Sequence, residues 1–178
     1  MDDQLAPRAP SDSEVVLVQL MTILDANIVG NVHGGTIMKL VDTAAGLSAA
    51  RHCHGLAVTA AMDEMSFLEP VYVGDLVTVK ATVNDAGTTS MEVGVRVDAE
   101  NIVSGRKVHT SSAYLVYVAL DDDGTPRRVP RVEPRTEEER QRQVEAKLRR
   151  ENRLARAAAI KAARDPGAVE STRADHRR

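Results

Sequence analysis

The chain has 178 residues, of which 43% are hydrophobic and only 2% aromatic, and its formal net charge is −3. This composition supports one domain with an aliphatic core and excludes an aromatic platform on which nucleobases would stack. The single cysteine, Cys53, excludes an internal disulfide, and with only His52 and His54 beside it this cluster falls short of a zinc site. We therefore expect neither a metal nor a cofactor.

The first ten residues, MDDQLAPRAP, are acidic and contain two prolines, with no apolar run after a basic patch. Neither a secretory signal nor a membrane-spanning segment is predicted from them. A lone cysteine also suits a reducing compartment. We expect a cytoplasmic protein that does not insert into a membrane and whose N-terminus, residues 1–12, is flexible.

The next part of the chain, residues 13–122, begins with a predicted strand and continues with a predicted helix. Residues 14–24 are rich in valine and leucine, which favours a strand. Residues 34–52 place apolar side chains at helical spacing around an alanine-rich stretch, which indicates a helix buried on most sides. These apolar positions are Ile37, Leu40, Val41, Ala44 and Leu47.

Four extended segments follow the helix, and 88–101 alternates apolar and polar residues most regularly among them. Short connections such as 85–87 predict that the later strands are antiparallel neighbours. The pattern therefore predicts an α+β fold, in which a five-stranded antiparallel sheet wraps around one central helix. The four segments are 56–71, 75–85, 88–101 and 106–120.

Charge divides the chain near residue 130. Lys and Arg number 9 against 17 Asp and Glu up to Pro130, and 14 against 9 from Arg131 onward. Thr136 with Glu139 has the spacing of a capping box and predicts a helix that runs to about Ala163. Acidic residues are interspersed among its basic ones, so we expect a solvated or partner-packed helix and no nucleic-acid partner. Residues 123–165 are thus a linker and a charged helix, and 166–178 a disordered tail.

One helix covers only part of one face of a five-stranded sheet, so the predicted fold is incomplete as a single copy. No second copy is present in this chain. The simplest completion is a symmetric homodimer in which the two sheets join edge to edge and the two helices meet near the two-fold axis.

The stretch DANIVGNVHGGTIMKLVD, residues 25–42, carries the candidate chemistry. If Gly34 and Gly35 open the helix, their unsatisfied N–H groups and the helix dipole form a potential oxyanion site that a ligand oxygen can approach closely. Asp42, two turns on, must be neutralised, hydrogen-bonded or exposed to a wet cleft. Alternatively, Asp42 makes only a structural bond, to Thr43, Thr22 or a backbone amide, and Asn27 is only a turn residue.

Two motifs give the sequence a family resemblance. DANIVGNVHGGTIMKLVDTAAG and VTAAMDEMSFLEPVYVGD contain N-x-x-G-x-x-x-G-G, seven residues before an Asp, and F-L-x-P-V-x-x-G-D. They closely resemble the cytosolic acyl-CoA hydrolases, the acyl-CoA thioesterases of the hotdog superfamily, from about residue 15 to 120. The resemblance implies a hotdog domain over 13–122, in agreement with the fold predicted from periodicity. It also implies hydrolysis of acyl-CoA thioesters to free fatty acid and coenzyme A.

The resemblance also implies roles for individual residues. Asp42 matches the family's general base or nucleophile, and Asn27 matches a carboxamide that places water and thioester from the opposite subunit. Gly35 matches the glycine whose N–H holds the thioester oxygen, with Gly34 beside it. Thr59 and His33 are expected in the pocket or its wall. The family often forms trimers of dimers, so we expect a hexamer.

Coenzyme A carries phosphates, for which Arg106 and Lys107 are the first candidate partners, with Arg51, Arg127 and Arg128 as further ones. A thioester is electrophilic enough that a held carbonyl oxygen and a carboxylate-activated water suffice. This agrees with the absence of G-x-S-x-G and of a catalytic cysteine.

Two other functions stay open on the sequence. Asp25, Asn27 and His33 partly match the D-x-N-P-x-H signature of hotdog enoyl-CoA hydratases, but the proline is missing and the histidine lies three positions too far along. The other alternative is a non-catalytic sensor that binds acyl-CoA in the same cleft.

Overall fold

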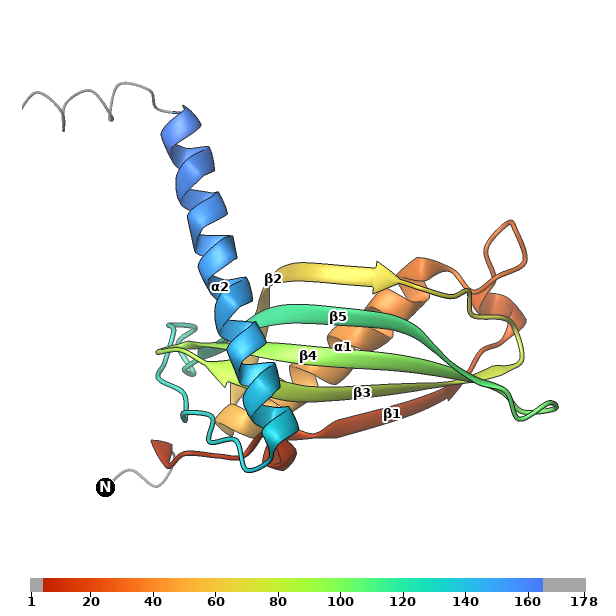
Figure 1. The fold of residues 1–178 in the computed structure, drawn as a ribbon, viewed down its shortest axis with the longest axis horizontal. Coiled ribbons are helices and arrows are strands. Elements are labelled where there is room, and N and C mark those ends of the chain that lie inside the picture. Colours follow the sequence, from red (N-terminus) through yellow and green to blue (C-terminus); the bar gives the residue numbers. More distant parts are fainter. Residues whose placement is uncertain (1–4, 165–178) are drawn as a thin grey trace, which may run out of the picture.

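The computed structural model describes residues 5–164, and its regular elements follow the predicted order (Figure 1). Two short 3-10 helices, η2 (Pro10–Ser13) and η3 (Ile23–Asp25), flank the strand β1 (Val15–Leu20). The remaining elements are α1 (Gly34–Cys53), β2 (Leu56–Phe67), β3 (Asp75–Ala86), β4 (Ser90–Asn101), β5 (Lys107–Leu120) and α2 (Glu137–Arg164).

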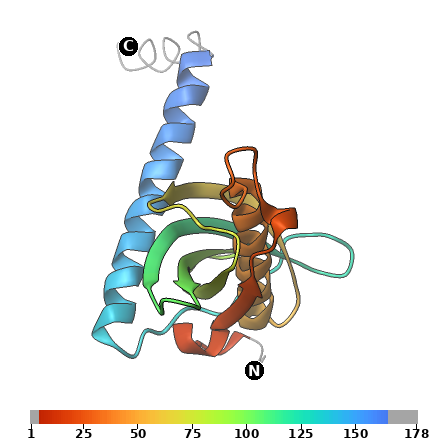
Figure 2. The same ribbon diagram turned by 90° about the vertical axis from the view of Figure 1, so that its right-hand side faces the viewer.

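The five strands form one antiparallel sheet in the order β1-β3-β4-β5-β2, so β1 and β2 are its edges. Figure 2 shows the sheet curling around α1, which lies in its concave side. The predicted α+β hotdog arrangement, a sheet wrapped around one central helix with a further C-terminal helix, is confirmed.

The core forms where the period-two strands meet the period-3.6 helix. From Met91 to Ala99, every second residue of β4 points toward α1 and is at most 4% exposed. On α1 the buried positions include Ile37, Val41, Ala44 and Ala45, which share one face because they lie three or four residues apart. The buried side chains of β4 are Met91, Val93, Val95, Val97 and Ala99.

Two predicted boundaries differ from the structure. The strand expected over 14–24 ends at Leu20, because Thr22 begins a capping box: its N–H donates to Asp25 Oδ2 at 2.8 Å and starts η3. The N-terminus expected to be flexible is fixed from Arg8 onward. The Arg8 N–H donates to Arg131 O at 2.9 Å, and Ala9 is fully buried.

The C-terminal helix α2 crosses the convex face of the sheet and extends past the edge strand β2 (Figures 1 and 2). Its predicted capping box is confirmed, since the Glu139 N–H donates to Thr136 Oγ1 at 3.1 Å and the Thr136 N–H to Glu139 Oε2 at 3.0 Å. Arg149 pairs with Glu92 of β4, and Arg153 pairs with Asp63 of β2. The tail predicted over 166–178 lies outside the described residues.

Within residues 5–164, no helix combines the length and the apolar character needed to span a bilayer.

Candidate active site

The predicted catalytic carboxylate, Asp42, lies on the exposed face of α1, where the helix meets the edge strand β2. Its Oδ1 accepts two hydrogen bonds, from Thr59 Oγ1 at 2.8 Å and from the Tyr117 hydroxyl at 2.7 Å. Thr59 on β2 and Tyr117 on β5 are direct cross-strand partners. Asp42 Oδ2 accepts no hydrogen bond from a described residue, so the carboxylate has one held oxygen and one open oxygen.

Both donors to Asp42 are neutral. Tyr117 is only 2% exposed, and burial, with its contact to Asp42 as a further cause, raises the pKa of its phenol well above the usual value. The phenol therefore stays protonated at physiological pH and can only donate. No salt bridge among the described residues involves Asp42. Within residues 5–164, therefore, no cation is paired with Asp42.

The start of α1 is capped by a side chain. His33 is the N-cap residue, and its Nδ1 accepts the Gly35 N–H at 2.9 Å. A Cβ on residue 35 would lie 2.9 Å from the same nitrogen, so this cap requires glycine. The N–H expected to hold a thioester oxygen is therefore occupied by His33 in this chain, whereas the Gly34 N–H has no partner among residues 5–164.

Asn27 lies in the loop before α1 and fixes its shape. Its Oδ1 accepts the N–H groups of Val29 at 2.8 Å and Asn31 at 3.2 Å. These bonds assign the amide oxygen, because a reversed amide would face two donors with its own NH₂ group. Asn27 Nδ2 has no partner among the described residues and is left as a donor. No hydrogen bond joins Asn27 to Asp42 within one chain.

The residues that partly matched the hydratase signature do not form an acid–base pair. Asp25 Oδ2 accepts from the Thr22 N–H and, at 2.9 Å, from its hydroxyl, while His33 Nδ1 accepts from Gly35. Both groups are used in capping, so nothing in their geometry favours hydration.

Some of the cations predicted to contact phosphate already bond to other protein groups, and others do not. Lys107 Nζ pairs with Glu100 Oε2 at 2.8 Å, and the exposed Arg106 side chain makes no hydrogen bond to a described residue. Arg51 donates to the backbone oxygen of Glu14, and Arg127 Nη2 to that of Cys53 at 2.6 Å. The last two fasten the C-terminal end of α1 and are structural.

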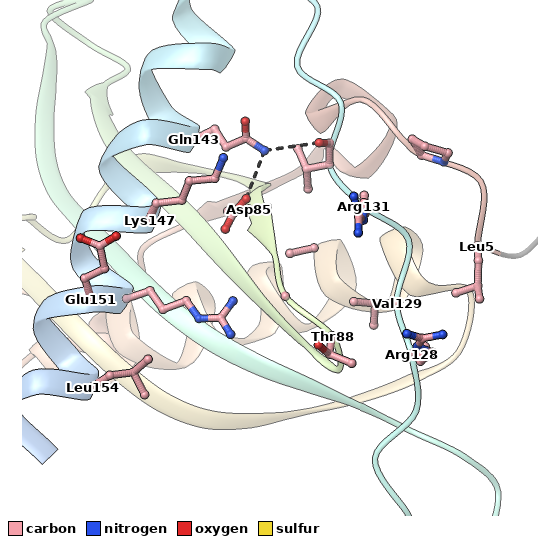
Figure 3. A pocket seen from close by; sticks show the side chains of 15 residues that line it. Leu5, Asp85, Thr88, Arg128, Val129, Arg131, Gln143, Lys147, Glu151 and Leu154 are labelled. Carbon is pink, nitrogen blue, oxygen red and sulfur yellow. Dashed lines mark hydrogen bonds between the residues drawn. The ribbon is translucent and has the colours of Figure 1, made fainter. Parts of the chain in front are cut away.

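A separate hollow of about 930 Å³ lies between α2, the β3–β4 turn and the linker before α2 (Figure 3). Its lining includes the cationic side chains of Arg128, Arg131, Lys147 and Arg150. None of the predicted catalytic residues lines it. Within residues 5–164, no group of three His, Cys, Asp or Glu residues could hold a metal ion.

Sequence reasoning missed Tyr117. The available signal was a phenol on the inward face of β5, because a buried Tyr hydroxyl usually finds a hydrogen-bond partner. Its pairing with Thr59 depends on the β2–β5 register, which no local pattern supplies. The structure places Thr59, expected as a pocket residue, in a hydrogen bond to Asp42.

A carboxylate on the central helix of a curled antiparallel sheet, held by two hydroxyl groups, can act as a general base toward water. The family model described as Thioesterase superfamily matches residues 29–105. A Bacillus subtilis relative, the uncharacterized acyl-CoA thioester hydrolase YkhA, is 42% identical over 72% of this chain and 74% of its own. The chain belongs to the acyl-CoA thioester hydrolase family.

Solved structures agree with this assignment. The crystal structure of an apo-hexameric acyl-CoA thioesterase matches with a TM-score of 0.84 at 37% identity, over 86% of this chain and 98% of that one. An acyl-CoA hydrolase from Staphylococcus aureus, solved with butyryl coenzyme A, coenzyme A and coenzyme A disulfide, matches with a TM-score of 0.82 at 33% identity. That match covers 90% of this chain and 98% of the S. aureus chain. Structures of this hydrolase with one aspartate, one asparagine or one threonine replaced by alanine also match.

Proposed function

We propose that this chain hydrolyses acyl-CoA thioesters to a fatty acid and coenzyme A, at a cytoplasmic site that two copies of the chain form together. The observation that carries the proposal is the geometry of Asp42: Thr59 and Tyr117 hold one of its oxygens, and no described residue donates to the other or pairs with the carboxylate. The S. aureus hydrolase, solved with butyryl coenzyme A, supports the substrate class.

The exposed surface around Asp42 supports completion of the site by a second copy. Near Asp42, α1 presents Met38 at 41% exposure, and the adjacent edge strand β2 presents Leu56 and Val58. Burial of these exposed apolar side chains against a second copy would favour association. An edge-to-edge pair of β2 strands would also satisfy the unpaired backbone groups of this edge.

The loop that contains Asn27 also exposes apolar side chains. Leu24, Ile28 and Val29 beside it are 92%, 105% and 79% exposed. Insertion of these side chains between α1 and β2 of a partner would bury them and would bring Asn27 Nδ2 toward the partner's site. In this arrangement Asn27 acts as a donor to the thioester or to the attacking water. The apo-hexameric thioesterase supports a trimer of such dimers.

The chemistry follows from the open oxygen. Asp42 Oδ2 takes a proton from water as the water oxygen bonds to the thioester carbon, and the carbonyl oxygen becomes an oxyanion. N–H groups at the start of α1, Gly34 and, once His33 turns away, Gly35, stabilise that oxyanion together with the helix dipole. The C–S bond then breaks and the proton passes from Oδ2 to the thiolate. Arg106 and Lys107 are the proposed contacts for the phosphates of coenzyme A.

The experiment that tests the shared site is subunit complementation, measured as thiol release from a panel of acyl-CoAs. Asp42→Ala and Asn27→Ala are each expected to be inactive. Unfolded, mixed and refolded together, they form mixed dimers with one intact site, which restores about a quarter of the wild-type rate. No recovery on mixing would contradict a site built from two subunits.

Thr59 provides a matched control, because it meets Asp42 within one chain. Thr59→Ala removes one donor to Asp42 and is expected to lower the rate. Mixed with Asn27→Ala, it should recover activity, whereas mixed with Asp42→Ala it should not. Hydrolysis in ¹⁸O-labelled water over a single turnover tests water activation separately: label in the fatty acid alone supports it, and label in Asp42 would show covalent attack instead.

A further inference from the structure

We propose that Tyr117 is a positioning residue for catalysis: with Thr59 it holds Asp42 Oδ1, so that Oδ2 is the oxygen that receives the proton of the attacking water. This inference rests on the proposed function. It assigns unequal roles to the two oxygens of Asp42, and it gives the buried phenol of β5 a part in the reaction.

The position of the Tyr117 hydroxyl is fixed by the sheet and by α1. Tyr117 lies in the middle strands, paired with Met91 of β4 on one side and with Thr59 of β2 on the other. Its ring lies against Gly46, where a Cβ would be 3.5 Å from the ring and from the hydroxyl. A buried ring packed against Gly46 gives its hydroxyl little freedom, so the side chain loses little further entropy when it bonds to Asp42.

The single phenol proton is available to the carboxylate. The Tyr117 hydroxyl lies 2.7 Å from Asp42 Oδ1 and 2.8 Å from the Asp42 backbone oxygen. Inside an α-helix that backbone oxygen already accepts the N–H four residues on, whereas the carboxylate bears the charge. The stronger, charge-assisted bond therefore goes to Oδ1.

The two donors differ in rigidity. Thr59 is exposed on the edge strand, and its oxygen moves with the side-chain rotamer, whereas the oxygen of Tyr117 is held in place by a buried, packed ring. Thr59 therefore follows the carboxylate, and Tyr117 sets its orientation. A neutral donor does this without cancelling the charge on which the basicity of Oδ2 depends.

The test is Tyr117→Phe, which removes one oxygen atom from a packed site. Because Oδ2 is then less well aimed, kcat should fall roughly 10-fold while KM stays within about twofold. Because the carboxylate loses a donor, the acid limb of the kcat/KM profile should move to higher pH by about one unit. Unchanged kcat and an unchanged acid limb would overturn the proposal.

Tyr114→Phe is the matched control, since Tyr114 lies on the same strand but faces α2. It should leave both kcat and the acid limb at wild-type values. As a second measurement, 3-fluorotyrosine at position 117 provides a more acidic phenol and a stronger donor, so the acid limb should move to lower pH. A shift in the other direction, or none, would count against the proposal.

The outcomes separate this inference from the proposed function. If Asp42→Ala retains the wild-type rate, the proposed site fails as a whole. If Asp42→Ala is inactive while Tyr117→Phe behaves as wild type in both readouts, only the positioning role fails.

Discussion

Two tyrosines three residues apart on β5 face opposite sides of the sheet, and each lies beside a carboxylate with a different environment. On the convex side, Glu92 pairs with Arg149 at 2.7 Å, and the Arg149 guanidinium stacks 3.6 Å from the centroid of the Tyr114 ring. On the concave side, Asp42 bonds to Tyr117 and Thr59 and makes no salt bridge with a described residue.

On the proposed mechanism, one strand contributes to stability on its convex side and to catalysis on its concave side. The charge of a buried carboxylate is balanced when it pairs with a guanidinium, so the carboxylate is a poor proton acceptor for water. A carboxylate held by neutral hydroxyl groups has no cation paired with it, and its orientation is fixed while its second oxygen stays open. We therefore expect substitutions on the convex side to alter the free energy of unfolding, and those on the concave side to alter kcat.

The largest expected effect is that of Asp42→Asn. The amide keeps the shape of the carboxylate but cannot accept a proton, so kcat should fall at least about 10³-fold. The free energy of unfolding should change little, because the side chain is exposed in the protomer. Thiol release and chemical denaturation measure the two quantities. Residual activity above a few per cent would place the general base elsewhere.

Glu92→Gln is the corresponding change on the convex side. Glu92 is 7% exposed, so this substitution leaves the Arg149 charge largely buried without its partner and should lower the free energy of unfolding by about 3 kcal/mol. The kcat of the folded protein should remain at the wild-type value. Glu137→Gln, which breaks the exposed pair with Arg140, is the control and should cost less than about 0.5 kcal/mol. A loss of kcat on Glu92→Gln would erase the distinction between the two faces.

A buried histidine outside the proposed site should make the free energy of unfolding depend on pH. His52 is fully buried with its Nε2 3.0 Å from Pro130 O, and burial lowers its pKa from 6.5. Below pH 6.5 the unfolded chain therefore binds a proton that the folded chain does not, so the free energy of unfolding should decrease as the pH falls. His52→Gln should flatten this slope in denaturation curves measured between pH 5 and 7. His54→Gln, at an exposed neighbour, should leave it unchanged.

The smallest expected effect is on the N-cap of α1. His33→Ala frees the Gly35 N–H and should raise kcat/KM about two- to threefold if that N–H holds the thioester oxygen. The lost cap should lower the free energy of unfolding by about 1 kcal/mol. Steady-state kinetics measures kcat/KM, and thermal unfolding measures the change in stability. A decrease in kcat/KM would show that His33 assists the reaction.

The sequence predicted those parts of the fold whose signals are local. The alternation from Met91 to Ala99 specified the inward face of β4, and Thr136 with Glu139 marked the start of α2. Features that depend on contacts distant in the sequence were beyond such reasoning. The partnership of Tyr117 with Asp42 joins residues 75 positions apart, and the anchoring of Arg8 at Arg131 joins the two ends of the domain.

The site residues were predicted unevenly for the same reason. The glycines and Asp42 follow from their places along one helix, and the structure shows Thr59 bonded to Asp42. The use of the Gly35 N–H by His33 could not be read from spacing, because it depends on the rotamer of one side chain. The facing of Asn27 and Asp42 across two subunits remains a prediction.

The edge strand β2 carries Thr59, contains two register shifts and is hydrogen-bonded within the described chain only to β5. Near the centre of β2, Asp63 also forms a salt bridge with Arg153, which lies four turns into α2 on the convex side. A truncation that removed α2 would release this second attachment and let the strand fray, although it would delete no group that touches a substrate. Residues of α2 far from the proposed site would thus help to keep the Thr59 hydroxyl within hydrogen-bond distance of Asp42.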